Sequence, residues 1–224
     1  TGLILALNLP STVPLWLPVI GGLFAIIVVK QFYGGLGQNF MNPALAARCF
    51  LLISFTGRMT NFVFDGMTSS TPLAILKNGE SFDLIKMFIG NTAGTIGETS
   101  AIALLIGFVY LVARKVISWE IPVIYVATTA VCLGILGIPM NVIPYELLAG
   151  GLLLGAIFMA TDYTTNPINR KGRIIFALGC GILTAVIRVK ASLPEGVSYA
   201  ICLMNLATPL IDKLTVTSAY GEAK

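Results

Sequence analysis

Four carboxylates are the first candidates for chemistry, because each lies beside or within an apolar stretch of the chain. They are Glu98, Asp162, Glu195 and Asp212. Burying a carboxylate in apolar surroundings is costly unless it pairs with a basic side chain or binds a cation. These four residues are therefore candidates for the path of an ion.

Each of these carboxylates also has a purely structural interpretation. Thr95 and Glu98 have the spacing of a capping box at the start of an apolar helix. Asp162 can cap a helix or form a salt bridge with Arg170, and Asp212 can lie at an exposed helix end. The sequence leaves both interpretations open.

A polar stretch, "FDGMTSSTPLAILKNGE", supplies a second candidate site. Its centre is the hydroxyl run Thr68-Ser69-Ser70-Thr71, followed by Pro72. Spacing alone favours a helix start, with Thr71 as the N-cap and Pro72 at the first helical position. This interpretation explains the hydroxyl groups without any chemistry.

The cysteines do not form a recognisable metal motif. None belongs to a CxxC pair and each lies in an apolar run, so we interpret them as small packing residues, with iron ligation across helix ends as the alternative. Histidine is absent, which excludes histidine-ligated haem and the usual zinc sites. The cysteines are Cys49, Cys132, Cys180 and Cys202.

The composition identifies the solvent in which these groups must be positioned. Of 224 residues, 56% are hydrophobic and 11% are charged, whereas soluble domains have about 25% charged residues. Such a chain cannot cover itself with polar side chains, so we expect a lipid bilayer around it. No basic cluster of the kind that binds nucleic acid is present.

Seven apolar runs predict a polytopic, all-α membrane protein, with residues 1–224 forming a single transmembrane domain. The second run is short, so we expect a tilted or broken helix packed inside the protein. The runs are Pro14–Phe32, Pro43–Phe55, Glu98–Val112, Ile121–Leu136, Tyr145–Ala160, Gly172–Ile187 and Glu195–Leu214.

Arginine and lysine residues between the runs predict the orientation. Alternating the runs across the membrane divides these basic residues into two groups, and the larger group is expected on the cytoplasmic side. Residues 56–97 belong to the other side and are therefore expected outside. The cytoplasmic group is Lys30, Arg114, Lys115, Arg170, Lys171, Arg173, Lys213 and Lys224, and the outer group is Arg58, Lys77, Lys86, Arg188 and Lys190.

Two Asn-Pro pairs suggest an internal repeat of the transporter kind. Asn42-Pro43 and Asn166-Pro167 are each followed by an arginine and later by a glutamate that opens an apolar run. The spacing between the Asn-Pro pair and the later glutamate is longer in the first half than in the second, by about the length of the polar stretch. That stretch therefore looks like an insertion, and insertions into loops often carry function.

Five blocks resemble the D-subunit family of the Rnf complex, the ion-pumping ferredoxin–NAD oxidoreductase of bacteria and some archaea. They are "GGLGQNFMNPALAAR", "DGMTSSTPLA", "GNTAGTIGETSA", "MATDYTTNPI" and "PEGVSYAICLMNLATPLID". The related B subunit of the sodium-pumping NADH–quinone reductase shares these blocks, but "ATPLID" and the short insertion look more like the Rnf member. The resemblance implies a cytoplasmic-membrane location, other Rnf membrane and flavin subunits as partners, and further helices before "TGLILALNLP".

The resemblance also implies a covalently bound FMN. In the family, a [Ser/Thr]-Gly-Ala-Thr tetrad carries it, and a separate flavin transferase joins the last threonine to the flavin phosphate. The matching tetrad is Thr68-Ser69-Ser70-Thr71, which implies attachment at Thr71 with Ser70 as the neighbouring rival. The resemblance places this loop, residues 57–97, outside the cytoplasm, and it implies riboflavin as a second flavin.

Two other classes of function fit parts of the sequence. The repeat and the glycine-rich segments also suit a channel or transporter for a small solute, which would bind no flavin. The chain also suits a structural anchor for redox partners, in which the hydroxyl groups are ordinary caps.

Overall fold

The structure of the chain is a computed structural model, and it describes residues 1–35, 37–64, 67–77, 83–191 and 196–215. Most of these residues are helical. The strand pairing in this part of the chain is a two-residue ribbon, in which β1 (Val63–Phe64) pairs antiparallel with β2 (Met67–Thr68). The predicted all-α class is therefore confirmed for the described residues.

The N-terminal helices are joined around α3. Asn42 caps this helix, because its side-chain oxygen accepts the backbone N–H groups of Ala44 and Leu45, and Pro43 occupies the first helical position. These helices are α1 (Gly2–Leu7), α2 (Trp16–Leu23), the π-helical η1 (Phe24–Val28), the 3₁₀ turn η2 (Gln31–Tyr33), α3 (Pro43–Ser54) and α4 (Thr56–Met59).

The rest of the chain forms the larger group of helices. They are α5 (Pro72–Lys77), α6 (Leu84–Ile89), α7 (Ala101–Ala113), α8 (Glu120–Ile135), α9 (Ile143–Leu148), α10 (Leu152–Leu154), the π-helical η3 (Gly155–Met159), α11 (Arg170–Lys190) and α12 (Val197–Thr215).

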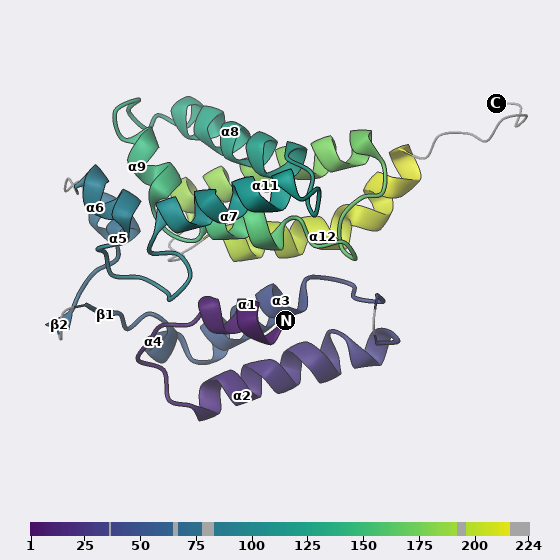
Figure 1. Ribbon diagram of the computed structural model, residues 1–224, viewed down its shortest axis with the longest axis horizontal. Coiled ribbons are helices and arrows are strands. Elements are labelled where there is room, and N and C mark those ends of the chain that lie inside the picture. Colours follow the sequence, from purple (N-terminus) through teal and green to yellow (C-terminus); the bar gives the residue numbers. More distant parts are fainter. Residues whose placement is uncertain (36, 65–66, 78–82, 192–195, 216–224) are drawn as a thin grey trace, which may run out of the picture.

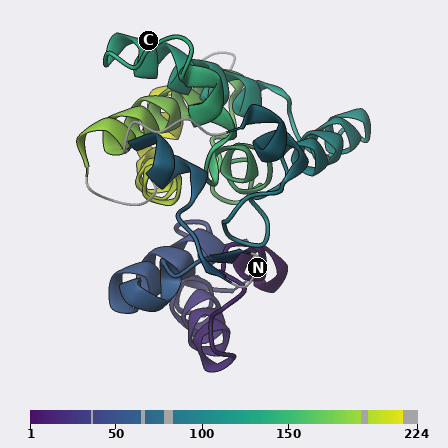
Figure 2. The same ribbon diagram turned by 90° about the vertical axis from the view of Figure 1, so that its left-hand side faces the viewer.

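The two groups of helices lie beside each other, and they appear as a lower and an upper layer in both views (Figures 1 and 2). Contacts of α3 with α12 join them, and the backbone N–H of Gly97 donates to the carbonyl of Leu7 at 2.7 Å. The Asn42 side chain also donates to the carbonyl of Met159 at 3.2 Å. In Figure 1, α4, the β ribbon, α5, α6 and α9 gather at the left, which we call the loop end, whereas α12 ends at the right.

The main core forms where α11 packs against α8 and α12. The Tyr125 and Thr184 hydroxyl groups lie 2.7 Å apart across the α8–α11 contact, where both side chains are fully buried. Gly181 allows this approach. A Cβ atom at this position would lie 2.6 Å from the Cβ of Thr128 and 3.0 Å from the carbonyl oxygen of Tyr125.

The predicted apolar runs correspond to helices, with two corrections. The run from Tyr145 to Ala160 is not one helix. It breaks at Gly150, whose φ is +65°, so that α9 lies before the break and α10, continued directly by η3, lies after it. The run expected to start at Glu98 forms a helix only from Ala101, because Ser100 is the N-cap and accepts the N–H of Ala103. The short α3 is largely buried inside the protein, as expected.

Two helical segments of the described chain are long and apolar enough to cross a membrane, Trp16–Tyr33 and Arg170–Lys190. Three further apolar helices are shorter: Pro43–Ser54, Ala101–Ala113 and Glu120–Ile135. The count of about seven spans and the internal repeat stay predictions.

The close contact at Gly181 makes a testable prediction. Replacing Gly181 with Ala should lower the free energy of unfolding by about 1–3 kcal/mol, because the added methyl group forces α8 away from α11. The measurement is the thermal unfolding of the detergent-solubilised protein. The matched control is Gly22→Ala in α2, where a Cβ meets no atom within 4 Å and stability should not fall. Equal losses in both variants would contradict this account of the α8–α11 contact.

Candidate functional site

Thr71 is the N-cap of α5, as its spacing to Pro72 predicts. Its carbonyl accepts the backbone N–H groups of Ala74 and Ile75 at 2.9 and 3.0 Å, and its hydroxyl oxygen accepts the N–H of Ala74 at 3.4 Å. The side-chain bond is long, so the hydroxyl adds little to the helix. The residue is half-buried.

The other hydroxyl residues are placed differently from Thr71. Ser69 and Ser70 are exposed, and Ser69 is fixed mainly by its backbone N–H, which donates to the carbonyl of Phe62 at 3.0 Å. Thr68 belongs to β2. Thr71 therefore differs from the exposed Ser70, its rival, in being half-buried.

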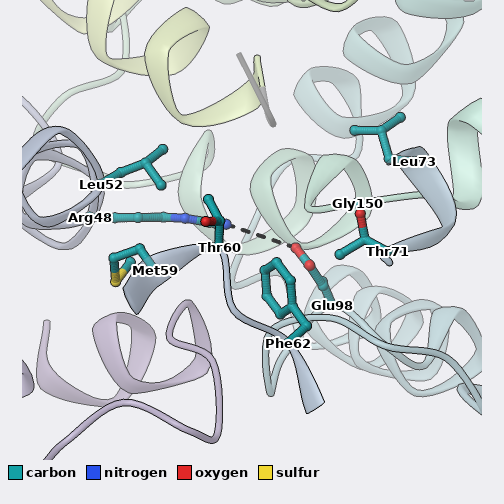
Figure 3. A pocket seen from close by; sticks show the side chains of 9 residues that line it. All are labelled: Arg48, Leu52, Met59, Thr60, Phe62, Thr71, Leu73, Glu98 and Gly150. Atoms are coloured by element: carbon teal, nitrogen blue, oxygen red, sulfur yellow. Dashed lines mark ion pairs between the residues drawn. The ribbon is translucent and has the colours of Figure 1, made fainter. Parts of the chain in front are cut away.

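Thr71 lines a pocket at the loop end, between the two groups of helices. The pocket has a volume of about 30 Å³, room for little more than a water molecule. Figure 3 shows Arg48 reaching from α3 toward Glu98, with the Glu98 carboxylate between Arg48 and Thr71 in this view. Apolar side chains complete the wall, so the pocket combines one basic and one acidic group with a largely apolar lining. These apolar side chains are Leu52, Met59, Phe62 and Leu73.

Glu98 is buried in a turn before α7, and its carboxylate has two functions in the structure. One oxygen, Oε1, accepts the backbone N–H of Thr95 at 3.0 Å, which is one half of the predicted capping box. The other oxygen, Oε2, lies 4.0 Å from Nη2 of Arg48. The capping-box pattern therefore forms around a turn rather than at the helix start, and its acid also pairs with a distant arginine.

Arg48 is the basic group of the pocket, and only 5% of the residue is exposed. Its Nη1 donates to the side-chain oxygen of Asn8, whose own amide group donates to the carbonyl of Ile4 at 2.6 Å. Arg48 thus ties the end of α1 to α3 and to the turn that carries Glu98. A buried guanidinium needs such partners because its desolvation is costly.

A second buried ion pair flanks the pocket at Gly150. Arg188 of α11 lies 3.2 Å from Oε2 of Glu146, and it also donates to the backbone carbonyls of Glu146 and Ala149. These two carbonyls lie where α9 ends, so Arg188 satisfies acceptors that the helix break leaves without helical partners. The Arg188 side chain is 2% exposed, so it is a buried partner of this helix break rather than a free loop charge, and its place on the outer side stays a prediction.

The remaining predicted carboxylates do not join this site. Asp162 accepts hydrogen bonds from the hydroxyl groups of Thr164 and Thr165 at 3.1 and 3.3 Å. The salt bridge considered between Asp162 and Arg170 does not form: Nε of Arg170 lies 2.6 Å from Oε1 of Glu120 instead.

Asp212 is not merely an exposed helix end. Its Oδ1 accepts the backbone N–H of Ile168 at 3.0 Å, so it joins the last turns of α12 to the segment before α11, at the end away from α5 and α6 (Figure 1). Glu195 lies outside the described residues. Of the four candidates, Glu98 alone is shown beside Thr71.

No cluster of three or more His, Cys, Asp or Glu side chains that could hold a metal ion occurs in the part of the chain that the structure describes. The four cysteines are free thiols. They lie in or beside the helix contacts, with Cys180 fully buried in the main core.

The sequence analysis did not foresee the two buried ion pairs that Arg48 forms with Glu98 and Arg188 forms with Glu146. A signal was present, because Arg48 and Glu146 are charged residues inside runs that are otherwise apolar and Arg188 directly follows such a run, and charges at these positions require partners. The identity of the partner carried no local signal, since each pair joins distant parts of the chain.

Comparison with known proteins identifies the family. The profile described as the NQR2, RnfD, RnfE family matches residues 1–221. The D subunit of the Na⁺-translocating ferredoxin:NAD⁺ oxidoreductase complex of Acetobacterium woodii is 49% identical over 233 residues, which cover 100% of this chain and 72% of the relative. The D subunit of the proton-translocating ferredoxin:NAD⁺ oxidoreductase complex of Clostridium ljungdahlii is 43% identical, and the alignment covers 100% of this chain and 74% of that relative. The D subunit of the ion-translocating oxidoreductase complex of Stutzerimonas stutzeri is 39% identical, with 99% and 75% covered. The chain therefore belongs to the NQR2, RnfD, RnfE family.

Proposed function

We propose that this chain is the D-type membrane subunit of an ion-translocating ferredoxin:NAD⁺ oxidoreductase, and that it carries FMN covalently on Thr71. Two relatives named as D subunits of ion-translocating ferredoxin:NAD⁺ oxidoreductase complexes align with 100% of the chain, and a third, named as the D subunit of an ion-translocating oxidoreductase complex, aligns with 99%. The observation that carries the residue assignment is the position of Thr71. It is a half-buried threonine on the wall of a pocket that also contains the buried Arg48.

The residues of the pocket fit such a group in charge and polarity. A phosphodiester carries a negative charge, and a guanidinium is the side chain best suited to bind phosphate oxygens. The pocket is too small for the flavin ring itself, so the ring of an FMN on Thr71 would lie outside it. When bound, FMN supplies a reversible electron carrier, while the protein determines its position and electrostatic surroundings.

Attachment at Thr71 is compatible with its cap. Forming an ester removes the hydroxyl proton of Thr71 but leaves lone pairs on the oxygen, so the contact with the N–H of Ala74 can persist. The helix is also held by the Thr71 carbonyl, which accepts two backbone N–H groups. Modification therefore does not require α5 to unfold.

The proposed setting is the cytoplasmic membrane of a bacterium or an archaeon, with the Thr71 loop outside and electrons exchanged with the other Rnf membrane and flavin subunits. The basic residues at the beginning of α11 and near the end of α12 support this orientation. Those helix ends lie at the opposite side of the molecule from α5 and α6 (Figure 1), and basic residues favour the cytoplasmic side.

We also propose that Glu98 handles the transported cation near the flavin. Glu98 is buried and lines the pocket together with Thr71 and Arg48, whereas Asp162 and Asp212 accept hydrogen bonds at other places in the structure. One relative is named for sodium and another for protons, and a carboxylate can accept either cation.

Covalent FMN on Thr71 makes the first prediction of this proposal. A peptide that contains Thr71, taken from native membranes, should carry the added mass of FMN. Thr71→Ala should abolish the fluorescent flavin band on a denaturing gel, because only a covalent flavin survives denaturation. Stability should fall by no more than about 1 kcal/mol, since the side-chain cap bond is long.

Two matched variants control for the loop. Thr71→Ser keeps a hydroxyl group at the same position and should keep the band, and Ser70→Ala removes only the exposed rival and should keep it as well. A bare Thr71 in cells that possess the transferase, or a band that persists in Thr71→Ala, would contradict the assignment and favour a flavin-free channel or anchor.

The cation role of Glu98 makes a second prediction. In membrane vesicles that contain the whole complex, Glu98→Gln should lower ion uptake driven by ferredoxin oxidation by about tenfold or more, equivalent to about 1.4 kcal/mol. The amide removes the charge but keeps an oxygen for the N–H of Thr95, so the turn should remain folded. Asp212→Asn is the control, because an amide oxygen can still accept the N–H of Ile168. Unchanged uptake in Glu98→Gln, with the flavin band intact, would rule out this role.

A further inference from the structure

We propose that Arg48 binds the phosphodiester on Thr71, and that Glu98 is the partner that holds the Arg48 side chain before the phosphate arrives. The inference rests on the proposed attachment of FMN to Thr71. It adds a positioning residue from α3, in a different group of helices from the modified loop.

The argument begins with the burial of Arg48. Its guanidinium lies in the wall of the pocket with Thr71, yet the side chain is only 6% exposed. A buried cation is tolerated only where nearby anions or hydrogen-bond acceptors replace its lost hydration. An anion that enters this pocket on Thr71 therefore meets a cation that is already desolvated and held in place.

The orientation of Arg48 follows from its contacts. Nη1 donates to the Asn8 side chain, which is itself held by the carbonyl of Ile4. Nη2 points to Glu98, at 4.0 Å from Oε2. This second contact lies beyond the usual range of charge-assisted hydrogen bonds, so it can be exchanged at less cost than the bond to Asn8.

The flanking arginine provides an internal comparison. Arg188 is equally buried, but its contacts with Glu146 and Ala149 are hydrogen bonds, and two of them go to backbone carbonyls that cannot move away. Arg188 is therefore committed to the helix break at Gly150. The contact of Arg48 with Glu98 is longer than that of Arg188 with Glu146, at 4.0 Å against 3.2 Å, and it lies in the wall of the pocket.

The charge of the pocket changes when the phosphate is present. Arg48 and Glu98 together are neutral, and a phosphodiester on Thr71 adds one negative charge beside a buried carboxylate. Two anions and one cation in a poorly hydrated pocket are unfavourable. Sharing Arg48 with the phosphate stabilises the phosphodiester and leaves Glu98 with a stronger preference for a proton or a metal cation.

The test uses the intact complex, purified from cells that possess the flavin transferase. The double variant Arg48→Gln/Glu98→Gln removes both members of the pair, so that no single charge stays buried. The matched control, Arg188→Gln/Glu146→Gln, removes the neighbouring buried pair. The flavin band on a denaturing gel reports attachment, while the ³¹P resonance of the phosphodiester and the fluorescence anisotropy of the flavin report its surroundings in the folded complex.

In the double variant, the ³¹P resonance should lose its displacement from that of the proteolysed flavinyl peptide, and the anisotropy should fall. Both readouts should keep their wild-type values in the control. A double variant with an intact band and wild-type ³¹P and anisotropy values would overturn the assignment of Arg48. A wild-type complex with no covalent flavin on Thr71 would instead contradict the proposed function.

A single variant tests the proposal if the double variant fails to assemble. Glu98→Gln keeps Arg48 but removes the charge that competes with the phosphate. The ³¹P resonance should therefore stay at least as far displaced from the free-peptide position as in the wild type. A resonance that moves to the free-peptide position in Glu98→Gln would show that Glu98, and not Arg48, positions the group.

Discussion

The arrangement of this protein around its pocket depends on one constraint, the need to compensate the buried charge of Arg48. The guanidinium is almost fully removed from solvent, and its partners come from the end of α1 and from the turn before α7. At 4.0 Å, two opposite unit charges attract by about 4 kcal/mol at an effective dielectric constant of about 20. This attraction is comparable to the effective cost of desolvating one ion. The Arg48–Glu98 pair therefore adds little net stability. Its main effect is to determine which segments of the chain lie in contact.

The same reasoning explains why the helix breaks lie near the pocket. At Gly150 the positive φ ends α9, and Arg188 becomes the partner of the carbonyls of Glu146 and Ala149. Gly150 is also where a side chain would meet both Leu73 of α5 and Nη2 of Arg188, at 3.5 and 3.7 Å. Because residue 150 is a glycine, the backbone at the break lies close to α5 and to the loop that carries Thr71. The irregular backbone at this break is tolerated because its carbonyl groups are buried in protein and accept hydrogen bonds from the charged Arg188 side chain.

Local patterns in the sequence predicted the elements well, because the forces that start helices act over a few residues. The Asn42-Pro43 and Thr71-Pro72 pairs do begin helices, and the short apolar run from Pro43 is buried as expected. The error at Glu98 has a physical cause. Capping-box spacing is identical whether the acid lies in a turn or at the start of a helix. In the structure, Ser100 caps α7 and Glu98 lies in the turn before it, where it pairs with Arg48 of α3. The pairing of Glu146 with Arg188 was likewise set by tertiary packing, which neither periodicity nor spacing encodes.

The pocket also suggests how an electron carrier and an ion site can influence each other without large movements. With the proposed phosphodiester on Thr71, Arg48 would be one cation shared between that phosphate and its ion-pair partner Glu98. Negative charge added at one place draws the guanidinium toward it and leaves the other with less compensation. In surroundings of low dielectric constant, the second place then gains affinity for an external cation. Linkage requires the converse as well: a cation bound at Glu98 releases Arg48 and makes negative charge on the group at Thr71 more favourable. In the proposed flavin-carrying protein, one buried arginine that contacts both the phosphate and the carboxylate of Glu98 therefore couples the charge of the one to the occupancy of the other.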